Sequence, residues 1–260
     1  MKEGKKFMNN DQSFLGTEPD GRLLMRLAVP TVIAQLVNML YNIVDRIYIG
    51  HIPGEGSLAL TGVGVCMPII MIVSAFAALV SSGGAPRASI FMGKKDQTSA
   101  EKILGNCFAL QIIISCILTA ILLRFNEPLL LAFGASSNTI SYATAYMQIY
   151  AFGTLFVQLT LGMNAFITAQ GFPGPGMTTT LIGAILNIFL DPLFMFVLLP
   201  PGREVAGAAV ATMLSNLIAP LYFVWIILGL RDKTVLSLNP AKGLPDRKNI
   251  LSVLSVGLPS

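Results

Sequence analysis

Residues 27–49 read LAVPTVIAQLVNMLYNIVDRIYI, an apolar run in which only one adjacent acid–base pair is charged. A helix needs about 20 mostly apolar residues to cross a bilayer, so this stretch predicts a membrane-spanning helix. Its polar residues Gln35, Asn38, Asn42 and Asp45 occur at i, i+3, i+7 and i+10. At 3.6 residues per turn they share one face of the helix. In lipid, such a polar stripe must face protein or a water-filled cavity.

Similar apolar runs recur along the whole chain. Apolar residues make up 54% of the 260 residues and charged residues 12%, roughly half the charged share of a soluble domain. We expect six membrane-spanning helices, at residues 27–49, 58–80, 104–123, 143–168, 177–199 and 206–230. A seventh run starts near Ile250 and reaches only Ser260, too short to cross a hydrocarbon layer of ~30 Å.

These runs predict an all-α, polytopic membrane protein with a single six-helix lobe. We expect a cytoplasmic segment over 1–22, the transmembrane lobe over 23–230, a cytoplasmic linker over 231–249 and an incomplete seventh helix over 250–260. The sequence would then stop at the start of a second lobe, as a fragment would. The first span would act as its own insertion signal, because the polar segment before it lacks the apolar core of a signal peptide.

Lysine and arginine gather in alternate connections. Fourteen of them lie before the first span, after the second and after the sixth, whereas only Arg124 and Arg203 lie in the opposite connections. The loop after the second span is expected to hold four of the fourteen, Arg87, Lys94, Lys95 and Lys102. The positive-inside rule predicts a multi-pass protein of the cytoplasmic membrane with its N-terminus inside. Nucleic acid is a poor partner for these basic clusters, since each adjoins a span.

Several local patterns carry weaker predictions. Thr98-Ser-Ala-Glu101 has the form of a helix-capping box, and the Gly/Pro-rich residues 171–176 favour a tight turn between the fourth and fifth spans. Tyr142, Tyr146 and Tyr150 are predicted to form an aromatic belt at the outer membrane surface.

The cysteines and the single histidine show no metal-binding or catalytic pattern. Cys66, Cys107 and Cys116 all fall in apolar runs, and we interpret them as small buried residues. Their spacing suggests neither a metal site nor a disulfide framework. We interpret His51 as an interfacial polar residue in preference to a proton relay.

Two carboxylates are the main candidates for function. Of the thirteen in the chain, only Asp45 and Asp191 lie inside predicted spans, where an ionisable group costs about 2.5–3.5 kcal/mol to insert. In the fifth span Thr180, Asn187 and Asp191 are spaced i, i+7 and i+11, so an amide and a carboxylate lie one turn apart. Pro192 cannot donate to the carbonyl four residues earlier, which leaves that oxygen available beside the carboxylate.

This arrangement predicts a site for a proton or a hard cation such as Na⁺. The alternatives are structural. The amides and threonines would also serve as hydrogen bonds between helices, which are common in membrane bundles. Asp45 would also pair with Arg46 or a lipid headgroup, and Asp191 would also act as a structural hydrogen-bonding group.

Four stretches together resemble the multidrug and toxic compound extrusion (MATE) family, and most closely its bacterial drug-efflux subgroup. They are Ala28-Val-Pro-Thr31 with Tyr41-Asn-Ile-Val-Asp-Arg46; Gly83-Gly-Ala-Pro-Arg87 with Gly93; Thr168-Ala-Gln-Gly171; and Asn187-Ile-Phe-Leu-Asp-Pro192 followed by Gly207-Ala-Ala-Val-Ala-Thr212. A short echo between Leu27-Ala-Val-Pro30 and Val256-Gly-Leu-Pro259 is typical of two parallel repeats.

The resemblance implies a transporter with twelve helices in two six-helix lobes, of which this chain would hold the first. It implies export of organic cations in exchange for H⁺ or Na⁺, with no other cofactor. It also implies that Asp45, Asn187, Asp191 and Thr212 form the coupling site, with Na⁺ as a possible ligand of the first three. Gln35, Asn38, Asn42 and Thr180 are expected to line the cavity.

Three other functions compete with drug export. A lipid-linked precursor or polysaccharide flippase of the same superfamily would share the architecture but need basic residues in its cavity, where Arg46 is the only intramembrane base expected. An intramembrane enzyme would need a nucleophile or metal constellation, which the dispersed Asp residues do not supply. A structural or channel-like subunit would leave both buried carboxylates unexplained. Binding of cationic dyes or of polyprenyl pyrophosphates would distinguish exporter from flippase.

Overall fold

The computed structural model describes residues 19–229 and 246–257, and every regular element in these ranges is helical. The elements are α2 (Asp20–Gly50), α3 (Gly56–Gly93), α4 (Gln97–Arg124), α5 (Asn126–Ala132), α6 (Ile140–Ala169), α7 (Pro173–Leu193), the π-helical η1 (Phe194–Leu198), α8 (Glu204–Gly229) and α9 (Arg247–Gly257). The predicted all-α class is confirmed. Within the described residues, α2, α3, α4, α6 and α7 with η1 are long and apolar enough to cross a membrane, and α8 contributes a shorter apolar stretch over Glu204–Ile218.

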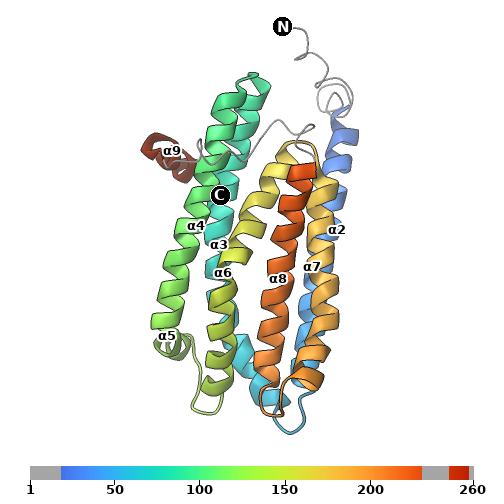
Figure 1. Ribbon diagram of the computed structural model, residues 1–260, viewed down its shortest axis with the longest axis vertical. Helices are drawn as coiled ribbons and strands as arrows, with labels where there is room; N and C mark the ends of the chain where they lie inside the picture. The colour runs from blue at the N-terminus through green and yellow to red at the C-terminus, as the bar shows by residue number, and fades with distance from the viewer. Residues whose placement is uncertain (1–18, 230–245, 258–260) are drawn as a thin grey trace.

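The long helices stand side by side and run along the long axis of the molecule (Figure 1). On one side α3, α4 and α6 pack against one another, and on the other side α7 packs against both α2 and α8. The contact between α6 and α8 joins the two groups. The short helix α5 lies at the lower end of the bundle, and α9 lies across the upper part of α3 and α4.

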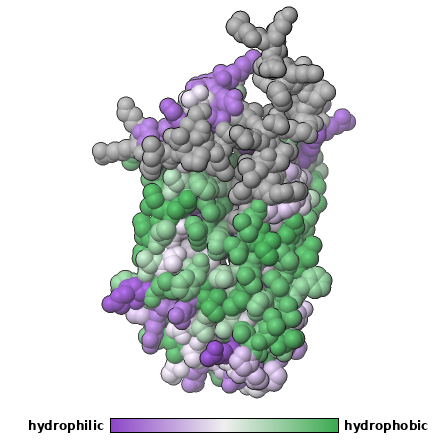
Figure 2. Space-filling view, viewed as in Figure 1, coloured by the Kyte–Doolittle hydropathy of each residue, from purple (hydrophilic) through white to green (hydrophobic). Residues whose placement is uncertain are grey.

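The surface has the pattern expected of a protein embedded in lipid. On the face seen in Figure 2, a broad hydrophobic band crosses the middle of the molecule, with hydrophilic residues gathered near its two ends. Helix α2 carries much of the exposed apolar surface, with Leu36, Met39 and Leu40 each more than half exposed. A water-soluble protein rarely exposes an apolar area of this extent, so the band is where we place the lipid.

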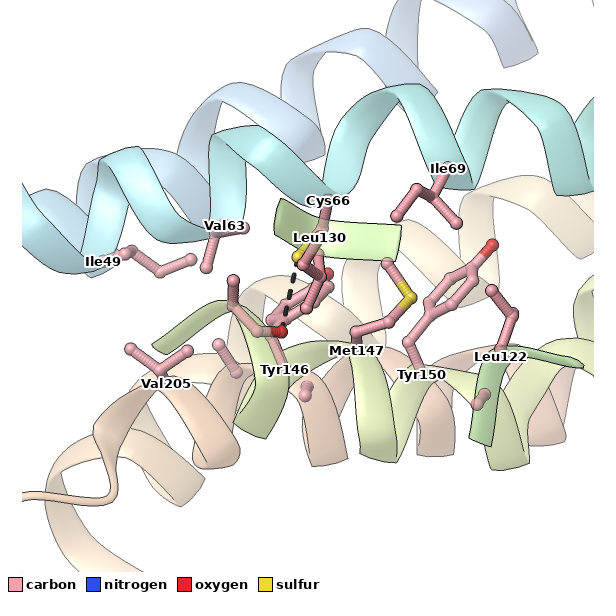
Figure 3. Packing of buried hydrophobic residues seen from close by; sticks show 14 of the residues in the cluster. Ile49, Val63, Cys66, Ile69, Leu122, Leu130, Tyr146, Met147, Tyr150 and Val205 are labelled. Carbon is pink, nitrogen blue, oxygen red and sulfur yellow. Dashed lines mark hydrogen bonds between the residues drawn. The ribbon is translucent and has the colours of Figure 1, made fainter. Parts of the chain in front are cut away.

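The larger of two hydrophobic clusters packs α3 against α6 at the lower half of the bundle. Figure 3 shows its side chains, among them Val63 and Cys66 from α3 and Met147 from α6. The Cys66 thiol donates a long hydrogen bond of 3.5 Å to the Ala143 carbonyl, which ties the two helices together. The second cluster joins α3, α4 and α6 higher up, around Phe166.

The connection after the second span is shorter than predicted. Helix α3 continues through Pro86 to Gly93, so Arg87 is a helical residue and only residues 94–96 separate α3 from α4. A proline costs a helix one backbone hydrogen bond, and here the helix tolerates that loss. Lys102 likewise lies in α4. The expected loop with four basic residues is therefore a basic end shared by two helices.

Two predicted helix boundaries are wrong by a few residues. Helix α4 begins after Asp96, whose carboxylate accepts the Ser99 N–H at 3.1 Å, so the N-cap is Asp96 and not Thr98. Hydrogen bonds from the side chain and backbone of Ser99 lower the pKa of Asp96. The turn between α6 and α7 occupies residues 170–172, with Gly171 at φ +85°, because Pro173 already begins α7. Proline suits that position, since its ring presets the helical φ angle.

The cysteines divide by environment. Cys66 and Cys107 are buried as predicted, whereas Cys116 is exposed on the outer face of α4.

The N-terminal segment before residue 19, most of the predicted linker and residues 258–260 lie outside the described residues.

Close packing of α3 on α4 and α6 depends on Gly84. A Cβ atom at this position would lie 2.5 Å from Cys107 Sγ and 2.7 Å from Phe166 Cζ. Replacing Gly84 with Leu should lower the free energy of unfolding by about 1–3 kcal/mol, because the added side chain overpacks a dense contact. Thermal unfolding in detergent measures this loss.

Gly64→Leu is the matched control, because Gly64 lies on the same helix and has open space where its Cβ would be. If Gly84→Leu were as stable as Gly64→Leu, the packing of α3 described here would be wrong.

Candidate functional site

A cavity of about 290 Å³ lies among α2, α3, α6, α7 and α8. The polar stripe of α2 faces it, and Gln35, Asn38, Asn42 and Asp45 all lie on its wall. Thr180 and Asn187 reach it from α7, and Thr212 from α8. The eight residues singled out by sequence are thus brought to one region, although Asp191 lies behind the wall and not on it.

Asn187 connects two helices at the innermost part of this region. Its side-chain Nδ2 donates to Asp191 Oδ1 at 3.2 Å and to Thr212 Oγ1 at 3.3 Å. Asn187 is 1% exposed and Asp191 is completely buried. The amide therefore holds the carboxylate of its own helix and the hydroxyl of α8 in a fixed relation.

The two carboxyl groups meet across the gap between α2 and α7. Asp45, which is 8% exposed, forms a side-chain hydrogen bond with Asp191. Two carboxylates offer only acceptors, so this contact requires a proton or another cation between them. Arg46 is close enough to act on Asp45 electrostatically, but the hydrogen-bonding partner of Asp45 is on the neighbouring helix.

Three buried oxygen atoms of this cluster have no hydrogen-bond partner. They are Asp45 Oδ1, Asp191 Oδ2 and Asn187 Oδ1. Leaving such atoms unpaired costs about 1–3 kcal/mol each, so a ligand that satisfies them would bind favourably. Carboxylate and amide oxygens suit a proton or a hard cation such as Na⁺. In the described part of the chain, no group of three or more His, Cys, Asp and Glu residues gathers to form a transition-metal site.

Helix α7 changes its geometry directly after the acid. Pro192 follows Asp191 within the helix, and the chain then passes into the π-helical turn η1. Proline removes one donor from the backbone ladder, and π-turns often occur at functional sites. The irregular part of α7 therefore lies next to Asp191, the residue for which ion binding was predicted.

The tyrosine belt predicted at the outer surface is wrong for two of its three members. Tyr146 and Tyr150 are each 5% exposed and lie on the cavity wall together with Tyr41. Tyr146 also hydrogen-bonds to Thr212, so it belongs to the acid cluster. The spacing could have revealed this, because Tyr150 lies eight residues beyond Tyr142, about 12 Å along a helix and too deep for an interfacial belt.

Comparison with known proteins places the arrangement in a family. Residues 30–193, more than half of the chain, match the family model MatE. The matched range contains α3, α6, α7 and most of α2, and it ends before α8. The chain belongs to the MatE family. The predicted resemblance is thereby confirmed.

Multidrug exporters are among the relatives of this MatE chain. It is 28% identical over 254 residues to the multidrug export protein MepA of Staphylococcus haemolyticus, which covers 97% of this chain and 55% of that protein. MepA of Staphylococcus aureus is 25% identical over 242 residues, covering 93% and 52%. The chain thus spans about half the length of the curated relatives it matches.

Solved structures agree with this assignment. A crystal structure of MATE in the straight conformation matches with a TM-score of 0.84 at 26% identity, over 96% of this chain and 54% of that one. A MOP superfamily transporter from Pyrococcus furiosus matches with a TM-score of 0.85 at 26% identity, and its description reports a binding pocket of reversed polarity that suggests a different function.

The hydroxyl of Thr212 links three helices of this MatE chain, which leads to a stability prediction. Thr212→Val keeps the shape but removes the acceptor of Asn187 and the partner of Tyr146, so the free energy of unfolding should fall by about 1–3 kcal/mol. The control is Thr178→Val, because the Thr178 hydroxyl bonds only the Gly174 carbonyl of its own helix, at 3.0 Å. Equal thermal unfolding of the two variants would contradict the cluster.

Proposed function

We propose that this chain forms the first lobe of a cation-coupled antiporter that exports organic cations. The observation that carries the proposal is the hydrogen-bonded pair Asp45–Asp191, held by Asn187 beside a cavity inside an apolar bundle. Buried carboxylates in a membrane bundle are expensive and are typical of ion pathways. Two acids that must share a cation can bind a proton or Na⁺ in one step and attract the exported cation in the next.

The coupling role is assigned to Asp45, Asn187, Asp191 and Thr212. Binding of H⁺ or Na⁺ lowers the negative charge of the pair from −2 to −1, which weakens its attraction for a cationic drug and favours release of that drug. Loss of the ion restores the negative charge and with it the affinity for the next drug molecule. The two ligands then exclude each other electrostatically, which is the requirement for exchange.

The cavity also offers apolar and aromatic surface for a drug. Tyr41, Tyr146 and Tyr150 line it together with the methionine Met67. Aromatic faces attract organic cations, and methionine adapts to ligands of different shape. Gln35, Asn38 and Asn42 add hydrogen-bonding groups from α2.

A lipid-linked precursor flippase is the second candidate, since a structurally similar transporter is described as having a different function. Shared fold alone does not decide between them, and the charge of the cavity must. The one basic residue on the described cavity wall is Arg46, and it lies beside an acid. Pyrophosphate recognition would require a cluster of bases, so the cavity favours the cationic substrate.

The proposal extends to topology and partners. The N-terminus and the basic ends of α3 and α4 are placed in the cytoplasm, with α5 on the outer side of the cytoplasmic membrane. Organic cations and the lipid bilayer are the proposed partners, together with a second lobe that completes the cavity. No cofactor other than the coupling ion is proposed, and no nucleic acid.

Efflux by the full-length protein in proteoliposomes tests the coupling assignment. Asp45→Asn and Asp191→Asn should each reduce gradient-driven export of a cationic dye by about tenfold or more, since loss of one group that binds the ion in a buried site costs more than 1.4 kcal/mol. Imposing a proton gradient and a Na⁺ gradient separately shows which ion drives export.

Asp96→Asn is the control for these variants. Asp96 is an exposed helix cap outside the cavity, and Asn caps a helix as well as Asp does, so dye export should remain at the wild-type level. Full export by both buried-acid variants would show that the coupling assignment is wrong.

A further inference from the structure

Two hydroxyl groups on the cavity wall have no hydrogen-bond partner. They belong to Tyr150 on α6 and Ser215 on α8, which are 5% and 3% exposed. An unpaired buried hydroxyl costs about 1–3 kcal/mol, and buried polar groups in native proteins nearly always bind protein or ordered water. These two groups therefore indicate a ligand that the helices themselves do not supply.

The two hydroxyls lie one helical turn beyond a pair that is already bonded. Tyr146 on α6 hydrogen-bonds Thr212 on α8, and Tyr150 and Ser215 follow these residues by four and three positions. The helices α6 and α8 pack side by side and run in the same direction, from the lower to the upper end of the bundle (Figure 1). Residues one turn further along each helix are thus at the next level of the same cavity.

We propose that Tyr150 and Ser215 together bind an ordered water molecule that relays protons between the Asp45–Asp191 pair and the rest of the cavity. The inference rests on the proposed function, because it supplies the route by which the ion-binding pair exchanges its proton. A buried water needs two to four polar partners and a polar site of sufficient size. Both hydroxyls can donate and accept, so the pair meets the first condition, and the cavity meets the second.

Neighbouring groups connect this site to the acids. The Tyr41 side chain interacts electrostatically with Tyr150 and also with both carboxyl groups, so it is near both the proposed water and the pair. The charged and titratable groups around the site are Tyr41, Asp45 and Arg46 from α2, Tyr146 from α6 and Asp191 from α7. The described cavity walls of α3 and α8 contribute only uncharged side chains.

The proposed step moves a proton without net chemistry. A protonated carboxyl gives its proton to a neighbouring oxygen, and each oxygen along the path accepts one proton as it donates another. Tyr150 and Ser215 end the step in the protonation state in which they began it, since they orient the water and do not become charged. The step needs no oxidant, reductant or further reactant.

Time-resolved infrared spectroscopy after a pH jump tests the relay in the full-length protein. The C=O stretch of a protonated carboxyl reports the pair, and its loss in Asp45→Asn and Asp191→Asn assigns the band. We expect Tyr150→Phe and Ser215→Ala to leave the final amplitude of this band unchanged. The band should appear about tenfold more slowly or slower still, because a positioned proton-transfer group typically accelerates a reaction about 10²–10⁴-fold. The double variant should be no slower than the slower single variant, because both lose the same water.

Two controls separate a relay from a structural role. Ser115→Ala removes an equally buried hydroxyl that is already bonded to the Ile112 carbonyl at 2.7 Å, and Tyr142→Phe removes a hydroxyl away from the cavity wall. In both control variants the carboxyl pair should become protonated at the wild-type rate. Ser215→Thr restores a hydroxyl and should recover the rate lost in Ser215→Ala. This comparison tests the relay even if Tyr150→Phe does not fold.

The outcomes distinguish the relay from the proposed function. Wild-type rates in Tyr150→Phe and Ser215→Ala would overturn the relay, whether or not the protein exports dye. A lowered melting temperature with an unchanged rate would also overturn it, because the hydroxyls would then be structural only. Slowed protonation in a protein that shows no gradient-driven export would support the relay and contradict the antiporter.

Discussion

The contact between the carboxyl groups of Asp45 and Asp191 is the constraint on which the rest of the structure depends. Each acid costs about 2.5–3.5 kcal/mol to place in a membrane helix, and two such groups side by side would repel if both were charged. A cation or proton between them reduces both penalties at once. The surrounding helices are therefore best understood as a frame that keeps this pair together and allows the cation to enter and leave.

The frame is built from interactions that are individually ordinary. Asn187 fixes Asp191 to Thr212, and the Cys66 thiol joins α3 to α6 in the core (Figure 3). Helix α8 begins close against η1, because Gly207 carries no Cβ, which would lie 2.8–2.9 Å from backbone atoms of Phe194 and Met195. This close approach fixes the position of α8 along its axis. Thr212, five residues after Gly207, therefore lies within reach of the Asn187 side-chain amide on α7. Packing of small residues thus positions the chemistry.

Much of the fold and part of the site could be predicted from the sequence. Apolar runs gave the helices, and the 3.6-residue period placed the polar stripe of α2 on one face, where the structure has a cavity. The contact of Asp45 with Asp191 could not be derived this way, because periodicity describes one helix and does not say which helices are neighbours. The family resemblance supplied that information, and the geometry agrees with it.

The errors have physical causes of a different kind. The basic loop after α3 was predicted because the apolar run of the second span ends at residue 80, but the helix continues through Pro86 to Gly93. Tyr146 and Tyr150 were assigned to a membrane interface from their residue type and their i, i+4 spacing, whereas both side chains line the cavity. His51 has its Nδ1 atom 2.7 Å from the Ile47 carbonyl, a local contact consistent with the interfacial role expected for it.

The most direct test of the central contact is a double-mutant cycle between Asp45 and Asp191. Thermal unfolding of the wild type, Asp45→Asn, Asp191→Asn and the double variant gives the interaction energy of the two side chains free of their individual effects. Since they share a proton or cation in a buried site, the account predicts a coupling energy of about 0.5–3 kcal/mol. Losses that add within about 0.3 kcal/mol would show that the two acids act independently, and would contradict the account.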